Sequence, residues 1–232
     1  MKTSSVYAYL EKPSMVDYPG HFAAVFFVSG CNFTCGFCHN ADLMGKKQAG
    51  LSYEKLEAAC QKFKANWVNA VVVTGGEPTL APDLPDLLRF FKSFGFAVKL
   101  DTNGSNPQML EKCLPLADYV AMDIKAGFSL YRDFVGFSKT DAIQQSINLI
   151  RKQAKDYEFR TTIIESIHTD EQVDEMAELV SGSKRYVLQA FIPRDELPGK
   201  AYRTMPRTTS ARLTKIKERV EGSVEELLVR GE

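Results

Sequence analysis

The stretch FAAVFFVSGCNFTCGFCHN, residues 22–40, joins an apolar run to three closely spaced cysteines. Residues 22–30 are apolar at almost every position, which is typical of a parallel strand that is covered on both faces. Cys31, Cys35 and Cys38 follow where this strand should end. Because functional groups of α/β proteins gather at the carboxyl ends of parallel strands, the stretch predicts both the fold class and the position of the site.

The same order of strand and helix recurs along the chain. Apolar or β-branched runs predict strands at 22–30, 69–75, 96–104, 118–125, 157–166 and 185–193. Helical patterns follow them at 52–66, 83–95, 106–116, 140–154, 169–182 and 207–222, with Ser52 and Gly95 as predicted caps. Six such units predict an α/β fold with a parallel sheet, as an open partial (β/α)6 TIM-like barrel. A doubly wound flat sheet is the alternative, since periodicity does not separate the two.

The composition argues against several classes of partner. The 232 residues carry 29 basic and 29 acidic side chains, so we expect no nucleic acid and no membrane as partner. No segment approaches the roughly 18 to 20 apolar residues of a membrane span. Five cysteines without the spacing of a disulfide scaffold indicate a reducing compartment. We therefore expect a cytoplasmic protein.

Polar residues follow the other predicted strands at their carboxyl ends. The segments TGGEPT (74–79) and DTNG (101–104) end the second and third strands. Asp123 and Lys125 end the fourth strand on the same side, because they are two residues apart. Arg160 lies within the fifth strand and Gln189 within the sixth. Polar groups that converge from six strand ends predict a binding site at one mouth of the sheet.

Three thiols in one loop suit either zinc or an iron–sulfur cluster. A structural zinc site needs four ligands, and His39 would be strained in the same tetrahedron as its neighbour Cys38. Cys60 and Cys113 lie on predicted helices and are expected to be buried as small apolar side chains. Three cysteines without a fourth favour a cubane cluster with one iron open to another ligand. A zinc-binding or electron-transfer module without catalysis is the alternative.

The segment CNFTCGFCHN, residues 31–40, matches the pattern CxxxCxΦC and resembles the radical S-adenosylmethionine enzymes, with Phe37 as the aromatic residue. The resemblance implies that Cys31, Cys35 and Cys38 hold a [4Fe–4S] cluster. It also implies that the methionine moiety of S-adenosylmethionine occupies the open iron.

The resemblance assigns further residues to the cofactor. In GGEP (75–78), the backbone at Gly75 and Gly76 and the Glu77 side chain are implied to receive its amino group. Asp101, Thr102, Asn103 and Asp123 are implied to lie near its carboxylate, where related enzymes hold a monovalent cation; an ordinary turn is the alternative for DTNG. The remaining implied contacts are Lys125 (or a pair with Asp123), Arg160 (or a structural ion pair), Gln189 near the ribose, and His39 in support of the cluster (or an exposed loop histidine). His21 and His168 are expected to be ordinary loop residues.

The longer segment SMVDYPGHFAAVFFVSGCNFTCGFCHN, residues 14–40, resembles the opening of the glycyl-radical enzyme activases. DTNG and DIK match that group, which includes the activators of pyruvate formate-lyase and of the anaerobic ribonucleotide reductase. DYPG and the absence of a ferredoxin-like insertion resemble the latter most. CHNA departs from the CHNP of many activases. The resemblance covers about 14–192, as the core of a single domain 1–232 with a helical extension at about 193–232, in which no motif was assigned.

The resemblance implies an oxidoreductase of anaerobic metabolism, and an exposed cluster held by three cysteines is expected to be sensitive to oxygen. The enzyme would cleave S-adenosylmethionine reductively to a 5′-deoxyadenosyl radical, which takes a hydrogen atom from a glycine of a partner protein. The electron would come from an external one-electron reductant of the flavodoxin or ferredoxin type. Hydrogen abstraction requires no acid or base, so no catalytic side chain is expected outside the cluster and cofactor site. A pyruvate formate-lyase type of activase, and a radical enzyme acting on a small molecule in deazapurine or cofactor biosynthesis, are the alternatives.

Overall fold

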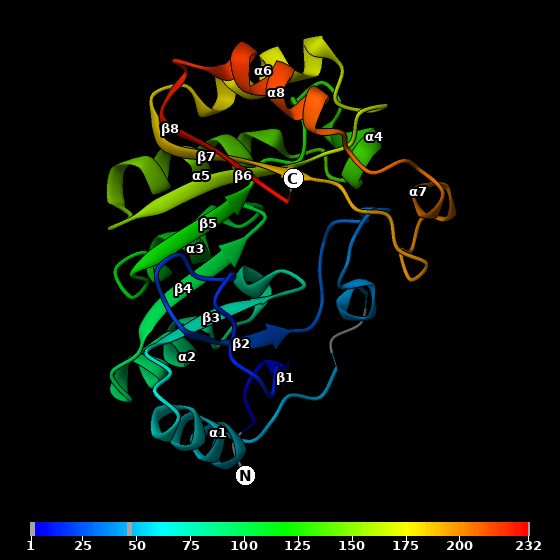
Figure 1. The fold of residues 1–232 in the computed structure, drawn as a ribbon. Helices are drawn as coiled ribbons and strands as arrows, with labels where there is room; N and C mark the ends of the chain where they lie inside the picture. Colours follow the sequence, from blue (N-terminus) through cyan, green and yellow to red (C-terminus); the bar gives the residue numbers. More distant parts are fainter. Residues whose placement is uncertain (1–2, 46–47, 232) are drawn as a thin grey trace.

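The computed structural model describes residues 3–45 and 48–231 and contains one eight-stranded sheet. The strands lie side by side in the order in which they occur along the chain (Figure 1). The first runs antiparallel to the second, and every later pair is parallel. The strands are β1 (Val6–Tyr9), β2 (Ala23–Val28), β3 (Ala70–Gly75), β4 (Ala97–Thr102), β5 (Tyr119–Asp123), β6 (Tyr157–Ile163), β7 (Ser183–Ala190) and β8 (Val224–Arg230).

This strand order confirms the open partial barrel. A doubly wound sheet reverses its strand order at a switch point, and no such reversal occurs between β2 and β8. The doubly wound alternative is therefore wrong. The six predicted strand and helix units are all present, and β8 extends them by one parallel strand.

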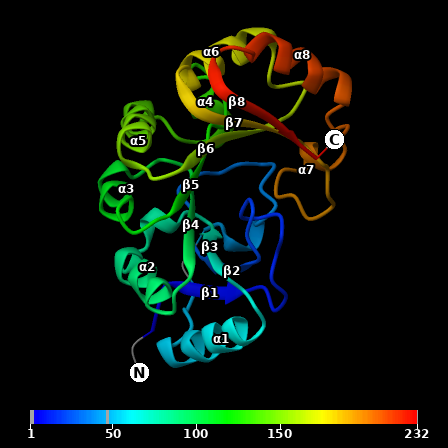
Figure 2. The ribbon, with the colours of Figure 1, turned by 60° about the vertical axis from the view of Figure 1, so that its left-hand side comes forward.

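Helices cover the outer face of the curved sheet (Figure 2). The main apolar core lies between these helices and the sheet, and a smaller cluster around Tyr18 and Tyr119 fills part of the inner face. The helices are α1 (Tyr53–Ala65), α2 (Leu84–Ser93), α3 (Pro107–Cys113), α4 (Tyr131–Val135), α5 (Thr140–Gln153), α6 (Asp170–Val180), α7 (Lys200–Arg203) and α8 (Ser210–Val220), with 3-10 turns at Ala41–Leu43 and Pro78–Leu80. None of the helices in the described ranges is long and apolar enough to cross a bilayer.

The predicted caps explain where two helices begin and end. The Ser52 side chain accepts a hydrogen bond from the Lys55 backbone N–H at the start of α1. Gly95 follows α2 with φ of 73°, a left-handed conformation that favours glycine. Cys60 and Cys113 are fully buried on α1 and α3, which confirms their assignment to the core.

The two ends of the chain differ from the sequence-based expectation. The antiparallel strand β1 was not predicted, because four residues are too short for a clear alternation. The segment after residue 192 is not wholly helical, since α7 and α8 are followed by β8, which pairs with β7. The sequence VEELLVR of β8 contains three charged residues and resembles a surface helix, so pairing with β7 overrides its local preference.

Candidate functional site

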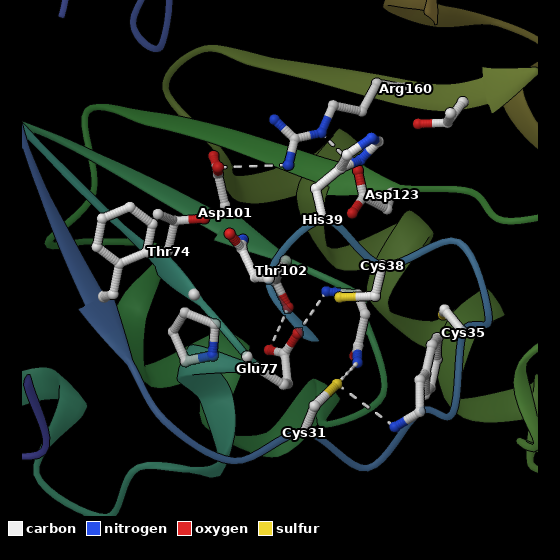
Figure 3. Close-up of a pocket in the computed structure, with 18 of the residues that line it drawn as sticks. Cys31, Cys35, Cys38, His39, Thr74, Glu77, Asp101, Thr102, Asp123 and Arg160 are labelled. Carbon is white, nitrogen blue, oxygen red and sulfur yellow. Dashed lines mark hydrogen bonds and ion pairs between the residues drawn. The ribbon is translucent and has the colours of Figure 1, made fainter. Parts of the chain in front are cut away.

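A cavity of about 450 Å³ opens at the carboxyl ends of the parallel strands (Figure 3). Its wall brings together every residue for which the sequence predicted a cluster or cofactor contact: Cys31, Cys35, Phe37, Cys38, His39, Gly75, Gly76, Glu77, Asp101, Thr102, Asn103, Asp123, Lys125, Arg160 and Gln189. Sequence reasoning missed Leu10, Asp17, Phe27 and Thr162, which also line the cavity. The inward-facing positions of β2 and β6 could have indicated Phe27 and Thr162, and Asp17 belongs to the DYPG segment already noted in the sequence, whereas Leu10 carried no signal.

The three cysteines lie on the loop that follows β2. The backbone N–H of Cys38 donates to the Cys35 carbonyl at 3.2 Å, and the Thr34 N–H donates to the Val135 carbonyl at 2.9 Å. The Phe33 N–H donates to the Cys31 Sγ at 3.4 Å. These contacts turn the loop so that Cys35 is buried while Cys31 and Cys38 are half-buried at the cavity wall.

Burial raises the pKa of all three loop thiols, that of Cys35 to about 12. In the metal-free chain they are therefore protonated at neutral pH, and binding of a metal would release their protons. In the described parts of the chain, no group of His, Cys, Asp and Glu side chains is arranged to hold a single metal ion. Three thiols at the wall of a roomy cavity are a donor set that fits an iron–sulfur cluster with space for a further ligand.

The two glycines at the end of β3, Gly75 and Gly76, are required by the backbone of β2 and its loop. A Cβ on Gly75 would lie 2.4 Å from the Val28 carbonyl oxygen, and a Cβ on Gly76 would lie 2.2 Å from the Gly30 carbonyl oxygen. The Gly76 and Glu77 N–H groups donate to the same two carbonyls, each at 2.8 Å. The glycine-rich strip therefore fixes the base of the cysteine loop, in addition to its predicted proximity to the cofactor.

Glu77 is fully buried and accepts hydrogen bonds from the chain itself (Figure 3). Its Oε1 accepts from the Thr79 N–H at 3.0 Å, the Thr79 hydroxyl at 2.5 Å and the Thr102 hydroxyl at 2.7 Å. Its Oε2 accepts from the Asn103 N–H at 2.6 Å. Burial raises the pKa of Glu77, and these four donors oppose the rise. The Glu77 carboxylate therefore links the end of β3 to the end of β4. The sequence did not indicate this structural role.

Five charged side chains form a row of alternating sign, and all of them except Lys99 line the cavity. Lys99 Nζ lies 2.5 Å from Asp101 Oδ1, and Arg160 Nη2 lies 3.3 Å from Asp101 Oδ2. Arg160 Nε lies 2.5 Å from Asp123 Oδ1, and Lys125 Nζ lies 2.7 Å from Asp123 Oδ2. Burial alone would raise the pKa of both carboxyls. The charges of Arg160 and Lys99 instead lower the pKa of Asp101 below its usual range, and those of Arg160 and Lys125 do the same for Asp123. Both carboxylates therefore remain ionised.

This arrangement changes the expectation for the cation. Each of the four carboxylate oxygens of Asp101 and Asp123 has a basic side chain beside it. The repulsion that a monovalent cation was expected to relieve is thus relieved by Lys99, Arg160 and Lys125. For Lys125 and Arg160, the ion pairs expected as alternatives are present.

The aromatic residue of the cysteine motif lies inside a ring cluster. Phe37 is 4% exposed, and its ring stacks on Phe134 with 4.8 Å between centroids and 15° between planes. His39 is exposed, and its Nε2 lies 3.1 Å from the Ile192 carbonyl. His168 is not an ordinary loop residue, because it is buried and bonds through Nε2 to the Lys125 carbonyl at 2.9 Å.

Comparison with protein families identifies a match over most of the chain. The model of the family described as the Radical SAM superfamily matches residues 25–180. A Methanocaldococcus jannaschii protein, provisionally named a glycyl-radical enzyme activating enzyme, is 35% identical over 190 residues, which is 78% of each chain.

Two further relatives are similar over about half of the chain. The pyruvate formate-lyase-activating enzyme of Clostridium pasteurianum is 35% identical over 123 residues, 50% of each protein. The 7-carboxy-7-deazaguanine synthase of Neisseria meningitidis serogroup B is 36% identical over 107 residues, 46% of this chain and 45% of that protein.

Solved structures show the same fold at low sequence identity. Streptococcus suis SuiB bound to S-adenosylmethionine superimposes with a TM-score of 0.68 and 17% identity. The match covers 91% of this chain and 52% of SuiB, so the chain spans about half of that protein.

Proposed function

Since this chain belongs to the radical SAM superfamily, we propose that it is a glycyl-radical enzyme activase whose partner is an anaerobic ribonucleotide reductase. The observation that carries the proposal is the cavity in which three cysteines of one loop meet the glycine-rich strip and the charged ends of β4, β5 and β6. The relatives named as glycyl-radical and pyruvate formate-lyase activating enzymes support the activase class. The DYPG segment supports the choice of partner. A pyruvate formate-lyase type of partner is the nearest alternative.

The superfamily uses a [4Fe–4S] cluster and S-adenosylmethionine. In this chain Cys31, Cys35 and Cys38 would hold the cluster, and the polar wall from Gly75 to Gln189 would hold S-adenosylmethionine. One-electron reductive cleavage of S-adenosylmethionine is the chemistry that these two groups supply when they are bound.

The residues of the chain bind and orient. The glycine-rich strip fixes the base of the cysteine loop through its two bonds to the Val28 and Gly30 carbonyls. The basic side chains Lys99, Arg160 and Lys125 outnumber the carboxylates Asp101 and Asp123 in the charged chain. Of these, Arg160 and Lys125 line the cavity, and they are the basic groups that would pair with the carboxylate of the methionine moiety.

An activase also needs an electron and a compartment in which thiols stay reduced. We propose a flavodoxin or ferredoxin type of reductant, because neither a second cysteine cluster nor a flavin motif is evident in the printed sequence. All five cysteines are free in the structure. Free thiols of this kind are typical of the cytoplasm.

A second candidate function is a radical enzyme that acts on a small molecule. It is favoured by the similarity to a 7-carboxy-7-deazaguanine synthase, which is as high in identity as that to the activases but covers less of the chain. The two candidates differ in what they require. Cleavage of S-adenosylmethionine by an activase leaves a radical on a partner protein, whereas a small-molecule enzyme needs no partner protein.

Electron paramagnetic resonance of the anaerobically reconstituted, reduced protein tests the proposal. We expect a [4Fe–4S]⁺ signal whose shape changes when S-adenosylmethionine is added. Cys35→Ala should abolish the signal, and the matched variant Cys60→Ala should keep it, because Cys60 lies in the core of α1. A wild-type cluster signal that ignores S-adenosylmethionine would remove the radical mechanism.

The partner is tested in a second step. Incubation with a purified anaerobic ribonucleotide reductase, reductant and S-adenosylmethionine should give a persistent glycine-centred radical on the reductase. Replacing the glycine that carries the radical by alanine should abolish that signal. Cofactor cleavage that is coupled to turnover of a purine-like small molecule, with no radical on any such partner, would favour the second candidate.

A further inference from the structure

The segment that follows β7, residues 192–203, folds back over the outside of the cysteine loop. Figure 1 shows α7, which ends this segment, on the side of the molecule to which the loop after β2 also extends. The Gly199 N–H donates to the Gly36 carbonyl at 2.9 Å. His39 Nε2 lies 3.1 Å from the Ile192 carbonyl. The two segments are therefore joined on both sides of Cys38.

Tyr202 of α7 packs directly on the residue between Cys35 and Phe37. A Cβ on Gly36 would lie 2.4 Å from Cε2 of the Tyr202 ring, so only a glycine allows this contact. The Tyr202 ring centroid is 5.9 Å from that of Phe37. Burial and the neighbouring Cys35 thiol raise the pKa of Tyr202, which agrees with its position against the loop.

Gly199 is equally restricted by this contact. A Cβ at Gly199 would lie 2.6 Å from Cδ2 of Tyr202 and 2.9 Å from the Gly36 carbonyl oxygen. Glycines at both positions thus let the loop, the segment and the tyrosine ring pack against one another at van der Waals distance.

The 192–203 segment is itself anchored to the barrel. Leu197 is 1% exposed, and the Arg203 Nε donates to the Leu197 carbonyl at 2.7 Å. At its flanks, the Phe191 N–H and the Thr208 hydroxyl both donate to the carbonyl of Ile163 at the end of β6, and the Thr208 N–H donates to the Phe191 carbonyl at 3.1 Å. A segment fixed at both ends can restrain what it contacts, since opening it breaks several contacts together.

From these contacts we infer that Gly199 and Tyr202 are positioning residues for the cluster, which hold Gly36 and thereby place and cover Cys35. The inference rests on the proposed function in so far as the thiols bind a cluster. The 192–203 segment carries no motif that the sequence assigned to cofactor binding. Its contribution would be to keep the cysteine loop in the ligating conformation and to exclude water and oxygen from its outer side.

Thiol labelling of the metal-free protein tests the covering of Cys35 without any activity. In Tyr202→Ala and Gly199→Ala, Cys35 should react with a thiol reagent about tenfold faster than in the wild type, because aromatic and backbone contacts that oppose local opening are lost. Cys60 and Cys113, both fully buried elsewhere, report on global unfolding and should stay protected. Equal labelling of Cys35 in all proteins would overturn the inference.

Two further variants serve as controls. Tyr202→Phe keeps the ring and should remain within about twofold of the wild-type labelling rate, as expected of a change that removes no packing. Tyr7→Ala removes a tyrosine that is 36% exposed on β1, outside the 192–203 segment, and should also be indistinguishable from wild type. Faster labelling of Cys35 in Tyr7→Ala would show a general loss of stability and overturn the specific role of Tyr202.

The reconstituted protein tests the role toward the cluster. Tyr202→Ala should lose iron to a chelator and bleach in air about tenfold faster than wild type, and Tyr202→Phe should restore the wild-type rates. Wild-type retention in Tyr202→Ala would overturn the inference while leaving the radical function intact. Failure of the wild type itself to bind iron would overturn the proposed function, and the labelling result would still decide whether the segment covers Cys35.

Discussion

The guanidinium of Arg230 on β8 donates to both carboxylate oxygens of Glu158 on β6, at 2.8 and 2.7 Å. Glu158 has no exposed side-chain surface, and the Tyr119 hydroxyl donates to the same carboxylate at 2.8 Å. Burial alone would raise the pKa of Glu158, but the hydrogen bonds and charge of Arg230 lower it. The last strand therefore supplies the charge that permits a carboxylate inside the barrel.

Arg230→Ala should cost about 3 kcal/mol in the free energy of unfolding, the lower end of the range for breaking a buried pair, because Arg230 is partly exposed. Urea denaturation at pH 7 measures it. Arg89→Ala is the matched control, since Arg89 pairs with Asp86 where both side chains are more than 60% exposed. It should cost less than about 1 kcal/mol. Equal costs for the two variants would show that Glu158 does not depend on Arg230.

His168 predicts a loss of stability in mild acid. Burial lowers the pKa of His168 below 6.5, although its hydrogen bonds to the Lys125 and Ile164 backbone oppose the shift. Below pH 6.5 the unfolded chain therefore binds a proton that the folded chain does not. The free energy of unfolding then decreases as the pH is lowered, by up to about 1.4 kcal/mol for each pH unit. This contribution is constant above pH 7.

His168→Gln removes that proton and tests the assignment. At pH 7.5 the variant should be less stable than wild type, because buried backbone groups lose a partner. At pH 5.5 the difference should shrink by about 1 kcal/mol, since only the wild type pays for a neutral histidine. Parallel pH curves for the two proteins would contradict the prediction.

The residues proposed to bind iron and the cofactor could be picked out from the sequence because the chemistry expected of them fixes their spacing locally. Cys31, Cys35 and Cys38 lie within eight residues, and the glycine-rich strip is contiguous. Parallel strands then bring their carboxyl ends to one edge, so the position of Arg160 and Gln189 in the same cavity followed from the strand pattern. This part of the prediction needed no knowledge of tertiary contacts.

The contacts between distant segments around the site could not be predicted from the sequence. The contact between Tyr202 and Gly36 joins segments more than 150 residues apart, and nothing in either segment encodes the other. The same holds for Lys99, which is buried inside the barrel although lysine usually favours solvent, and whose ammonium group pairs there with Asp101. Side-chain partners across a barrel depend on register, which local patterns do not specify.

Glu77→Gln should destabilise the metal-free protein. A glutamine has one acceptor oxygen and an NH₂ group, and the NH₂ group would face hydrogen-bond donors. The donors of Thr79, Thr102 and Asn103 would then compete for the single remaining oxygen. We expect a loss of about 2 kcal/mol in unfolding free energy. Glu57→Gln, on the exposed face of α1, should change little and is the control. Indistinguishable stabilities of the two variants would mean that Glu77 does not organise this turn.

Gly76→Ala should displace the base of the cysteine loop. The new Cβ would meet the Gly30 carbonyl oxygen, a backbone atom that cannot rotate away, so we expect a cost of about 2 kcal/mol. The iron content after reconstitution should fall with it. Gly20→Ala separates steric contact from backbone strain, since Gly20 has φ of 76° and no atom near its Cβ position. Normal iron content in Gly76→Ala would show that the loop tolerates the displacement.

Arg160→Gln tests whether the guanidinium occupies the role expected of a monovalent cation. Without it, Asp101 and Asp123 keep Lys99 and Lys125 but lose the positive charge that they share. The metal-free variant should then be more stable in potassium chloride than in choline chloride of equal ionic strength. A difference of about 1 kcal/mol is expected, the effect of an ion at roughly five times its Kd. Wild type should show no difference, because the same oxygens already face basic side chains. Stabilisation of the wild type by potassium would instead show that an ion binds beside Arg160. Asp101 and Asp123 would then contact both the guanidinium and a potassium ion.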